Sequence, residues 1–375
     1  MSEAFPHIEA LCVSALGVPT DRPESDGTFA WNRTVLVVVE ATSSGVTGTG
    51  YTYADAATAL LVRDQLSKVV LGKDAMALTA SYDAMVHAVR NLGREGVAAM
   101  GISAVDAALW DLKARLLSVS VLALLGPARK SVPVYGSGGF TSYDLKELTT
   151  QLAGYVERGI PRVKMKIGRE PKEDVGRVRA AREAIGPSAE LFVDANGAYA
   201  RKQALAFAER FAALGVIWFE EPVSSDDLRG LRLLRDRAPA PLEIAAGEYG
   251  YSPRYFERML GAGAVDVIQA DATRCGGVTG FLRAAAIADA HGLPLSAHCA
   301  PALHAHLGCA CAGVRHLEYF HDHERIERLV FEGALEPKHG ELVPDRSRPG
   351  FGLSLARDSA ERYALEGFWK RRADA

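Results

Sequence analysis

The chain has 375 residues, of which 48% are hydrophobic and 24% are charged, and its formal net charge at pH 7 is −3. This length exceeds that of a typical single domain, so one large domain and one smaller domain are expected. The sequence has no block of basic residues and no apolar run near the roughly 18 residues that span a bilayer, which argues against nucleic acid or a membrane as partner.

The cysteines and the first residues indicate where the protein works. Five cysteines are an odd number, and no two of them form a CxxC pair, which favours reduced thiols over a disulfide framework. The first residues lack the basic start and apolar stretch of a signal peptide. A cytoplasmic location is therefore expected.

The first part of the chain mixes strand and helix signals and is predicted to be α+β. Residues 34–40 are β-branched and apolar, which predicts a strand. The Gly/Thr-rich residues 44–50 follow as a predicted hairpin turn, and their GxxGxG spacing differs from the dinucleotide-binding GxGxxG. Residues 98–125 have helical spacing of apolar residues and end at Gly126-Pro127, so one long helix is expected.

From Val132 onward, short β-rich runs alternate with amphipathic helical stretches. Such alternation predicts a parallel sheet, and eight runs favour a closed β/α barrel. A doubly wound open sheet is the alternative, although the chain lacks a nucleotide fingerprint. The eight predicted strands are residues 132–135, 162–167, 190–194, 216–220, 242–246, 265–270, 294–298 and 316–320.

Seven ionisable residues lie at or just after the ends of successive predicted strands, 20 to 28 residues apart. The carboxyl ends of all strands in a β/α barrel converge on one mouth, where active sites are built. Residues distant in sequence would therefore share one small space. These residues are Lys166, Asp194, Glu220, Glu248, Asp271, His298 and Glu318.

Three of the seven, Asp194, Glu220 and Glu248, are carboxylates on consecutive strands. Three like charges in a partly dry mouth repel one another unless a cation neutralises them. An all-oxygen set suits a hard ion, which favours Mg²⁺ and leaves Mn²⁺ open. The alternative is three separate salt bridges to basic residues.

Two lysines, Lys164 and Lys166, are two residues apart on one strand and therefore point to the same face. Two buried ammonium groups lower each other's pKa, which would move one of them towards a usable general base. A KxK pair alone is more often a solvated strand edge, so the functional interpretation depends on the neighbouring carboxylates.

Asp271 and His298 end adjacent predicted strands on the other side of the barrel. A carboxylate that accepts from one imidazole nitrogen raises the basicity of the other, which makes this pair a candidate acid or base. Glu318, if protonated, could donate a hydrogen bond to a substrate carboxylate; the alternative is an ordinary ion pair.

Further histidines invite a zinc-hydrolase interpretation. They lack HExxH or another known ligand spacing, so they are predicted to be mainly structural or peripheral. They are His304, His306, His316, His321 and His323.

In combination, these motifs resemble the mandelate racemase subgroup of the enolase superfamily over essentially the whole chain. The matching motifs are Lys164-Met165-Lys166-Ile167-Gly168, Asp194-Ala195-Asn196, Glu220-Glu221-Pro222, Gly247-Glu248, Asp271 with Cys275-Gly276-Gly277, His298 and Glu318. The resemblance implies a modified barrel, (β/α)7β, with an α+β capping domain. It implies a capping domain at residues 1–126, a barrel at 127–340 and a returning segment at 341–375.

The same resemblance implies roles for the residues. Asp194, Glu220 and Glu248 would bind Mg²⁺, which stabilises the enediolate formed when the proton alpha to a carboxylate is removed. Lys166, tuned by Lys164, would be the base on one face of the substrate. The pair of His298 and Asp271 would serve the opposite face, and Glu318 would hydrogen-bond the carboxylate.

The resemblance favours dehydration of a sugar acid to a 2-keto-3-deoxy acid. Racemisation, epimerisation and lactone cycloisomerisation are alternatives, as is a non-catalytic barrel that binds a sugar acid. We expect a small-molecule carboxylate substrate and a homo-oligomer. Specificity is predicted to come from a loop at Gly17 to Ala30 and a turn near Tyr51 and Tyr53. Within this region the candidate contacts are Asp21, Arg22, Glu24 and Trp31.

Overall fold

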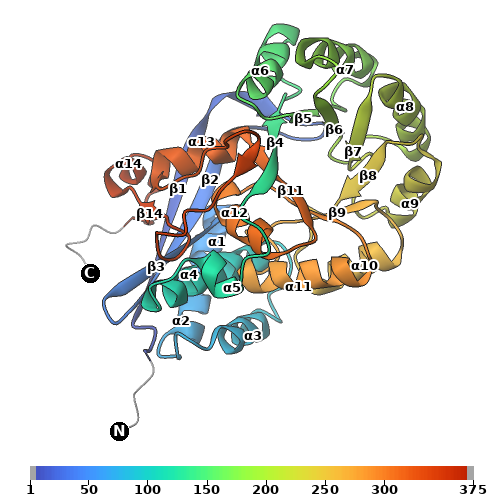
Figure 1. Cartoon of the computed structure of the whole chain (residues 1–375). Coiled ribbons are helices and arrows are strands. Elements are labelled where there is room, and N and C mark those ends of the chain that lie inside the picture. Colours follow the sequence, from blue (N-terminus) through green and yellow to red (C-terminus); the bar gives the residue numbers. More distant parts are fainter. Residues whose placement is uncertain (1–5, 370–375) are drawn as a thin grey trace.

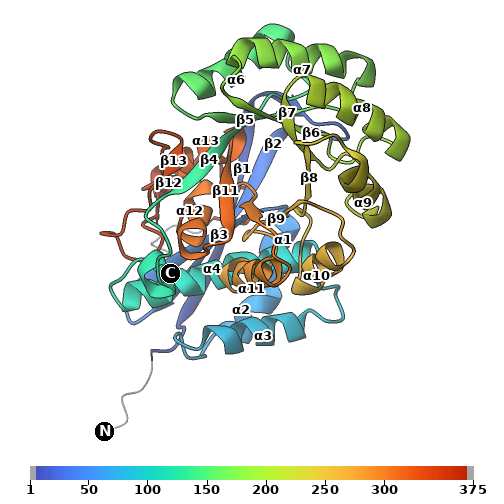
Figure 2. The same cartoon turned by 45° about the vertical axis from the view of Figure 1, so that its right-hand side comes forward.

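The computed structural model describes residues 6–369. The N-terminal part forms an antiparallel sheet of order β1-β2-β3, with four α-helices and one π-helical turn after it. The bounds are β1 Ala10–Ser25, β2 Ala30–Ser43, β3 Val46–Tyr53, α1 Ala56–Leu61, the π-helical turn Val62–Leu66, α2 Ser67–Val70, α3 Leu78–Ala88 and α4 Val97–Leu116. A short helix, α5 Val121–Leu125, leads into the second part. Figures 1 and 2 show the sheet and helices α1–α4, in blue to cyan, beside the barrel.

The second part is a closed barrel of eight parallel strands, in which β4 to β11 follow one another around the ring and β11 pairs with β4. The strands are β4 Val132–Gly138, β5 Arg162–Lys166, β6 Glu190–Asp194, β7 Val216–Glu220, β8 Glu243–Ala246, β9 Val267–Ala270, β10 Leu295–Ala297 and β11 Val314–Phe320. The helices between them are α6 Leu145–Glu157, α7 Pro171–Ile185, α8 Arg201–Ala213, α9 Leu228–Arg237, α10 Pro253–Gly261, α11 Gly277–Ala290 and α12 Pro301–Ala310. Seven βα units followed by a last strand confirm the predicted (β/α)7β barrel.

The end of the chain contacts both parts. After β11 come α13 His321–Val330, the paired strands β12 Phe331–Glu332 and β14 Ser354–Leu355, and α14 Arg357–Glu361. Strand β13, Glu341–Leu342, pairs antiparallel with barrel strand β4. Ala364 bridges to Leu16 of β1, so the segment reaches the N-terminal sheet (Figure 1).

An apolar layer inside the barrel supports the mouth. Phe192 and Trp218 precede Asp194 and Glu220 by two residues, so they point to the same interior side of their strands. Their rings stack at 5.2 Å between centroids and belong to a buried cluster with Tyr135. This aromatic cluster therefore lies directly beneath the charged side chains and excludes water from that side.

Three predictions for the N-terminal part are wrong. Residues 44–50 are not one turn, because the turn is confined to Ser44 and Gly45 and β3 begins at Val46. The predicted loop from Gly17 to Ala30 is mostly strand, with β1 running to Ser25. The helix predicted at 98–125 breaks after Leu116, because Ser120 starts a new helix by accepting from the Ala123 N–H.

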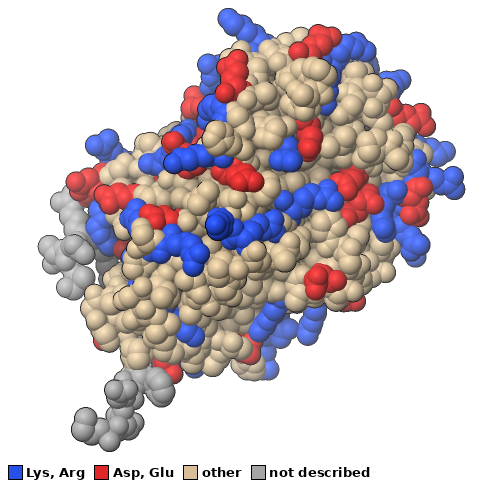
Figure 3. Space-filling model, in the orientation of Figure 1, with Lys and Arg blue, Asp and Glu red and all other residues tan. Residues whose placement is uncertain are grey.

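On the face in Figure 3, basic and acidic side chains are intermingled. Within residues 6–369, no helix combines the length and the hydropathy that crossing a bilayer requires.

Candidate active site

A cavity of about 380 Å³ lies at the carboxyl ends of the barrel strands and is closed on one side by the N-terminal sheet. The residues from the barrel that line it are Lys166, Asn196, Glu248, Tyr249, Arg274, His298, Cys299, Glu318, Phe320 and His323. Those from the N-terminal sheet are Asp26, Thr28, Phe29, Trp31, Arg33, Thr34, Val35, Tyr53 and Ala54.

The three predicted metal ligands meet in this mouth. Asp194 and Glu220 are the last residues of β6 and β7, and Glu248 follows β8 by two residues. One carboxylate oxygen from each lies within 4.8 Å of the others, and all three side chains are buried. Burial and the charge of Asp194 raise the pKa of Glu220 to about 8. Such crowding of buried carboxylates, with oxygen donors only, fits a hard divalent cation.

The two lysines lie against these carboxylates. Lys164 Nζ is 2.6 Å from Glu220 Oε1 and 2.8 Å from Glu318 Oε1, and Lys166 Nζ is 2.5 Å from Asp194 Oδ2. Burial lowers the pKa of each lysine, but the surrounding carboxylate charges outweigh it, so both pKa values are raised. The prediction of lowered lysine pKa values is therefore wrong for this structure, because ion pairing exceeds the repulsion between the two ammonium groups.

His298 and Asp271 form the predicted pair. Each directly follows its strand, β10 and β9, and His298 Nδ1 lies 2.9 Å from Asp271 Oδ2. The other ring nitrogen, Nε2, faces the cavity at 3.2 Å from Glu248 Oε2. Burial lowers the pKa of His298, but the charges of Glu248 and Glu318 together with the Asp271 hydrogen bond raise it well above its ordinary value. The imidazole is thus held as a proton donor.

Glu318 lies two residues before the end of β11 and divides its two oxygens between neighbours. Oε1 accepts hydrogen bonds from Ser137 Oγ at 2.6 Å and from Lys164 Nζ. Burial raises its pKa, but the charge of Lys164 outweighs burial and lowers the pKa below its usual range. In this structure Glu318 is therefore an acceptor, not the protonated donor considered from sequence.

Sequence reasoning missed four residues at the site. Arg274, three residues after Asp271, lies 3.5 Å from Glu248 Oε1, and this Asp-x-x-Arg spacing after a strand was a readable signal. Cys299 follows His298 and places Sγ 3.4 Å from its Nε2. Asn196 Oδ1 and Glu221 Oε1 are buried without a hydrogen-bond partner among the described residues. Both belong to motifs that the sequence shows, but the sequence does not show that Asn196 lines the cavity or that Glu221 is buried beside the carboxylates.

Most of the other histidines have local structural roles, as predicted. His304 Nε2 accepts from the Ala272 N–H, His306 Nδ1 accepts from the Leu122 N–H, and His316 Nδ1 bonds Ser296 Oγ. His323 stacks on the Tyr53 ring at the cavity wall. His321 pairs with Asp21 at 3.0 Å outside the cavity.

The predicted specificity residues divide into two groups. Trp31 and Tyr53 line the cavity, on strands instead of the expected loop and turn. Glu24 is buried behind Trp31 and accepts from its indole Nε1 at 2.8 Å. Asp21 and Arg22 lie outside the cavity, and Arg22 forms an ion pair with Glu147. Tyr51 is fully buried and bonds Glu327 at 2.5 Å.

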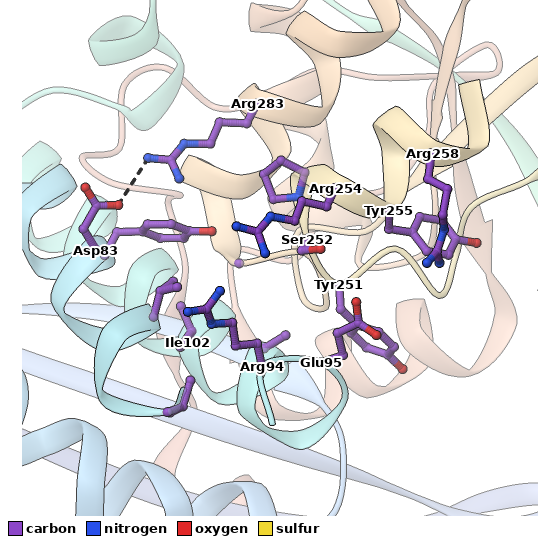
Figure 4. Close-up of a pocket in the computed structure, with 16 residues that line it drawn as sticks. Asp83, Arg94, Glu95, Ile102, Tyr251, Ser252, Arg254, Tyr255, Arg258 and Arg283 are labelled. Atoms are coloured by element: carbon purple, nitrogen blue, oxygen red, sulfur yellow. Dashed lines mark ion pairs between the residues drawn. The ribbon is translucent and has the colours of Figure 1, made fainter. Parts of the chain in front are cut away.

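A second cavity, of about 370 Å³, lies between the N-terminal helices and α10 and α11 (Figure 4). Arginines surround it, including Arg94, Arg254 and Arg283, and Arg283 pairs with Asp83 at 3.5 Å. Among the described residues that line it there is no histidine or cysteine and no cluster of three acids. The barrel mouth is therefore the site equipped for acid–base chemistry at a cation.

Comparisons with known proteins place the chain. The L-talarate/galactarate dehydratase of Salmonella typhimurium strain LT2 is 32% identical over 94% of this chain and 90% of its own length. A structure of that enzyme liganded with Mg and L-lyxarohydroxamate has a TM-score of 0.89 at 30% identity, covering 97% of this chain and 94% of the other. The 3,6-anhydro-alpha-L-galactonate cycloisomerase of Streptomyces coelicolor is 35% identical over 86% of this chain and 89% of its length.

A mandelate racemase/muconate lactonizing enzyme-like protein from Rubrobacter xylanophilus has a TM-score of 0.94 at 55% identity, covering 96% of this chain and all of the other. The model for the mandelate racemase/muconate lactonizing enzyme N-terminal domain matches residues 15–126. The enolase C-terminal domain-like model matches residues 147–359. The chain therefore belongs to the mandelate racemase/muconate lactonizing enzyme family of the enolase superfamily.

Proposed function

We propose that this protein removes the proton alpha to the carboxylate of a sugar acid and, with loss of the β-hydroxyl as water, forms a 2-keto-3-deoxy acid. One observation carries the proposal. Three carboxylates, two at the ends of β6 and β7 and one just after β8, are flanked by Lys166 at the end of β5 and by His298 after β10. A substrate at the mouth therefore meets a lysine on one side and an imidazole on the other.

Asp194, Glu220 and Glu248 are the proposed ligands of Mg²⁺, as relatives liganded with Mg support. When bound, the ion neutralises the substrate carboxylate and the charge that develops as the alpha proton leaves. The oxygen-only donor set and the crowding of buried negative charge support this assignment.

Lys166 is the proposed base, because its Nζ lines the cavity whereas Lys164 is fully buried beneath it. The charge of Asp194 now holds Lys166 protonated. When a divalent cation shares the negative charge of Asp194, we expect the pKa of Lys166 to fall towards neutrality. The ammonium group of Lys164 favours this fall, because it still repels the proton on Lys166. The positive charge of Lys164 then lies beneath the substrate carboxylate, and Glu318, which pairs with Lys164, can hydrogen-bond that carboxylate only after it takes up a proton.

His298 is the proposed acid for the second half of the reaction. Its Nε2 faces the cavity and its Nδ1 is held by Asp271, so the ring can deliver one proton in a fixed direction. The Cα–H bond breaks towards Lys166 Nζ, the Cβ–O bond breaks as His298 protonates the hydroxyl, and the enol product becomes the keto acid in solution.

The same half-reaction supports racemisation, epimerisation or cycloisomerisation, in which His298 returns a proton to carbon or a ring opens without loss of water. The similarity to a cycloisomerase supports this alternative.

We further propose that the protein acts in the cytoplasm as a homo-oligomer in the breakdown of carbohydrate acids. The proposed domains are residues 1–126 and 127–340, with a returning segment at 341–375. The five free cysteines support a reducing compartment.

Screening mono- and diacid sugars for 2-keto acid formation in Mg²⁺, with deuterium exchange at C2 measured in parallel, tests the proposal. Lys166→Ala should abolish both signals. His298→Asn should abolish 2-keto acid formation but keep C2 exchange, because the base remains. Lys172→Ala, an exposed lysine on α7, is the control and should leave both unchanged. Full turnover in both active-site variants would refute the assignment.

A further inference from the structure

Cys299 lies between two groups of the proposed machinery. Its Sγ is 3.4 Å from His298 Nε2 and 3.3 Å from Glu318 Oε2, and the nitrogen and oxygen are 3.6 Å apart. All three side chains are buried, and all three line the cavity. One nitrogen, one sulfur and one oxygen thus form a nearly equilateral triangle that faces the cavity.

The dimensions of this triangle match one face of a tetrahedral zinc site. Metal-ligand bonds of about 2.3 Å to sulfur and about 2.0–2.2 Å to nitrogen or oxygen give ligand-to-ligand edges of roughly 3.3–3.6 Å at tetrahedral angles. Glu248 Oε2, 3.2 Å from His298 Nε2, offers a fourth oxygen beside the triangle. The three donor atoms already lie at the mutual distances that such a site requires.

The groups behind the triangle orient it as they do in metal sites. Asp271 Oδ2 holds His298 Nδ1, which leaves Nε2 free to coordinate. Ser137 Oγ and Lys164 Nζ hold Glu318 Oε1, which turns Oε2 towards the thiol. Cys299 and Ala300 have φ angles of 55° and 40°, a strained conformation that persists only where the surroundings impose it.

We propose that His298, Cys299 and Glu318 form a second metal site, selective for a thiophilic divalent cation of the zinc class, whose occupation inhibits the enzyme. The oxygen-only set of Asp194, Glu220 and Glu248 suits Mg²⁺, whereas a set with sulfur and nitrogen selects Zn²⁺. Coordination displaces two protons, one from the Cys299 thiol and one from Nε2 of His298, so the imidazole can no longer donate a proton. The inhibition rests on the proposed function; the coordination does not.

Cobalt replaces zinc as a spectroscopic probe. The Mg²⁺-loaded protein should bind one further Co²⁺ and develop a near-ultraviolet thiolate-to-cobalt charge-transfer band, which Zn²⁺ then removes. Cys299→Ser and Cys299→Ala should lack the band. Cys309→Ser, a buried thiol on α12 outside the cavity, should keep it. Thermal unfolding of each variant verifies that it is folded.

Activity gives the second readout. Loss of a group that supports a metal ligand weakens metal binding roughly 10–100-fold. Cys299→Ser removes a ligand itself, so it should raise the zinc concentration that gives half-inhibition by more than this factor. Absence of the band in the parent protein, or its persistence in Cys299→Ser, would overturn the site. Zinc inhibition that Mg²⁺ relieves and that Cys299→Ser does not change would place zinc at the oxygen set and overturn it too. If no sugar acid is turned over, the spectrum alone still decides.

Discussion

Glu24 carries a carboxyl group that the fold keeps protonated near neutral pH. Burial and the charge of Asp322 raise its pKa to about 9, and its Oε2 accepts from Trp31 Nε1. The unfolded chain loses this proton near the ordinary value of 4.5, so between pH 4.5 and 9 the folded state holds more protons than the unfolded state. The contribution of Glu24 to stability is therefore greatest below pH 4.5 and decreases as pH rises towards 9.

Glu24→Gln removes this dependence, because an amide resembles the protonated carboxyl. We expect the variant to exceed the parent in free energy of unfolding by about 2–4 kcal/mol at pH 8 and by little at pH 5. Urea denaturation at both pH values measures the difference. Glu157→Gln, at an exposed position on α6, should show no such trend. An equal effect of Glu24→Gln at both pH values would contradict the raised pKa.

Arg33 lines the cavity from β2 and has no acidic partner within ion-pair distance among residues 6–369. A guanidinium in the cavity wall without a carboxylate partner among the described residues suits the distal carboxylate of a diacid sugar. Arg33→Ala should raise KM for diacids by about 10-fold, the value of one charged hydrogen bond, and change KM for monoacids little. Arg22→Ala is the control, because Arg22 pairs with Glu147 outside the cavity. Equal changes for both substrate classes would exclude this role.

Among the strands and helices, sequence reasoning succeeded in the barrel and was only partly right in the N-terminal part, where the α+β character and the strand at residues 34–40 are confirmed. A buried parallel strand is a short apolar run that a charged residue ends, so β6 and β7 were predicted with their observed bounds. The sequence signals for the N-terminal sheet are weaker, and the glycines of β3 wrongly indicated a turn. Gly48 and Gly50 serve close packing against α4, which local sequence cannot distinguish from a turn.

This packing predicts the effect of adding one methyl group. A Cβ at Gly50 would overlap the backbone of Ala104 and Ala108 in α4, where no side chain can move aside. Gly50→Ala should therefore lower the free energy of unfolding by about 1–3 kcal/mol or more. Gly176→Ala on α7 is the control, since its Cβ meets nothing within 4 Å and alanine favours a helix by roughly 0.5–1 kcal/mol. Denaturant unfolding compares the two, and a neutral Gly50→Ala would contradict the tight contact.

At the level of the complete protein, the sequence predicted which residues meet but not how their charges balance. The strand-end positions follow from one repeat and one barrel rule, so residues from β5 to β11 could be placed together without coordinates. The direction of the pKa shifts of Lys164 and Lys166 could not be predicted, because it depends on ion-pair distances of 2.5–2.8 Å that only the folded chain defines. The same balance governs how the metal should act on stability.

Mg²⁺ should stabilise the folded protein, because the site exists only when strands β6, β7 and β8 are assembled. Saturation at about 100 times Kd adds roughly 2.7 kcal/mol and should raise Tm by a few degrees above its value in chelator. Glu220→Gln should abolish most of this shift while leaving Tm in chelator equal or higher, because the substitution removes one of several crowded buried carboxylates whose pKa is already raised to about 8. Lys164 keeps Glu318 as its partner at 2.8 Å in that variant. A variant with a lower Tm in chelator and an undiminished Mg²⁺ shift would show that Glu220 pairs with lysine and does not bind the metal.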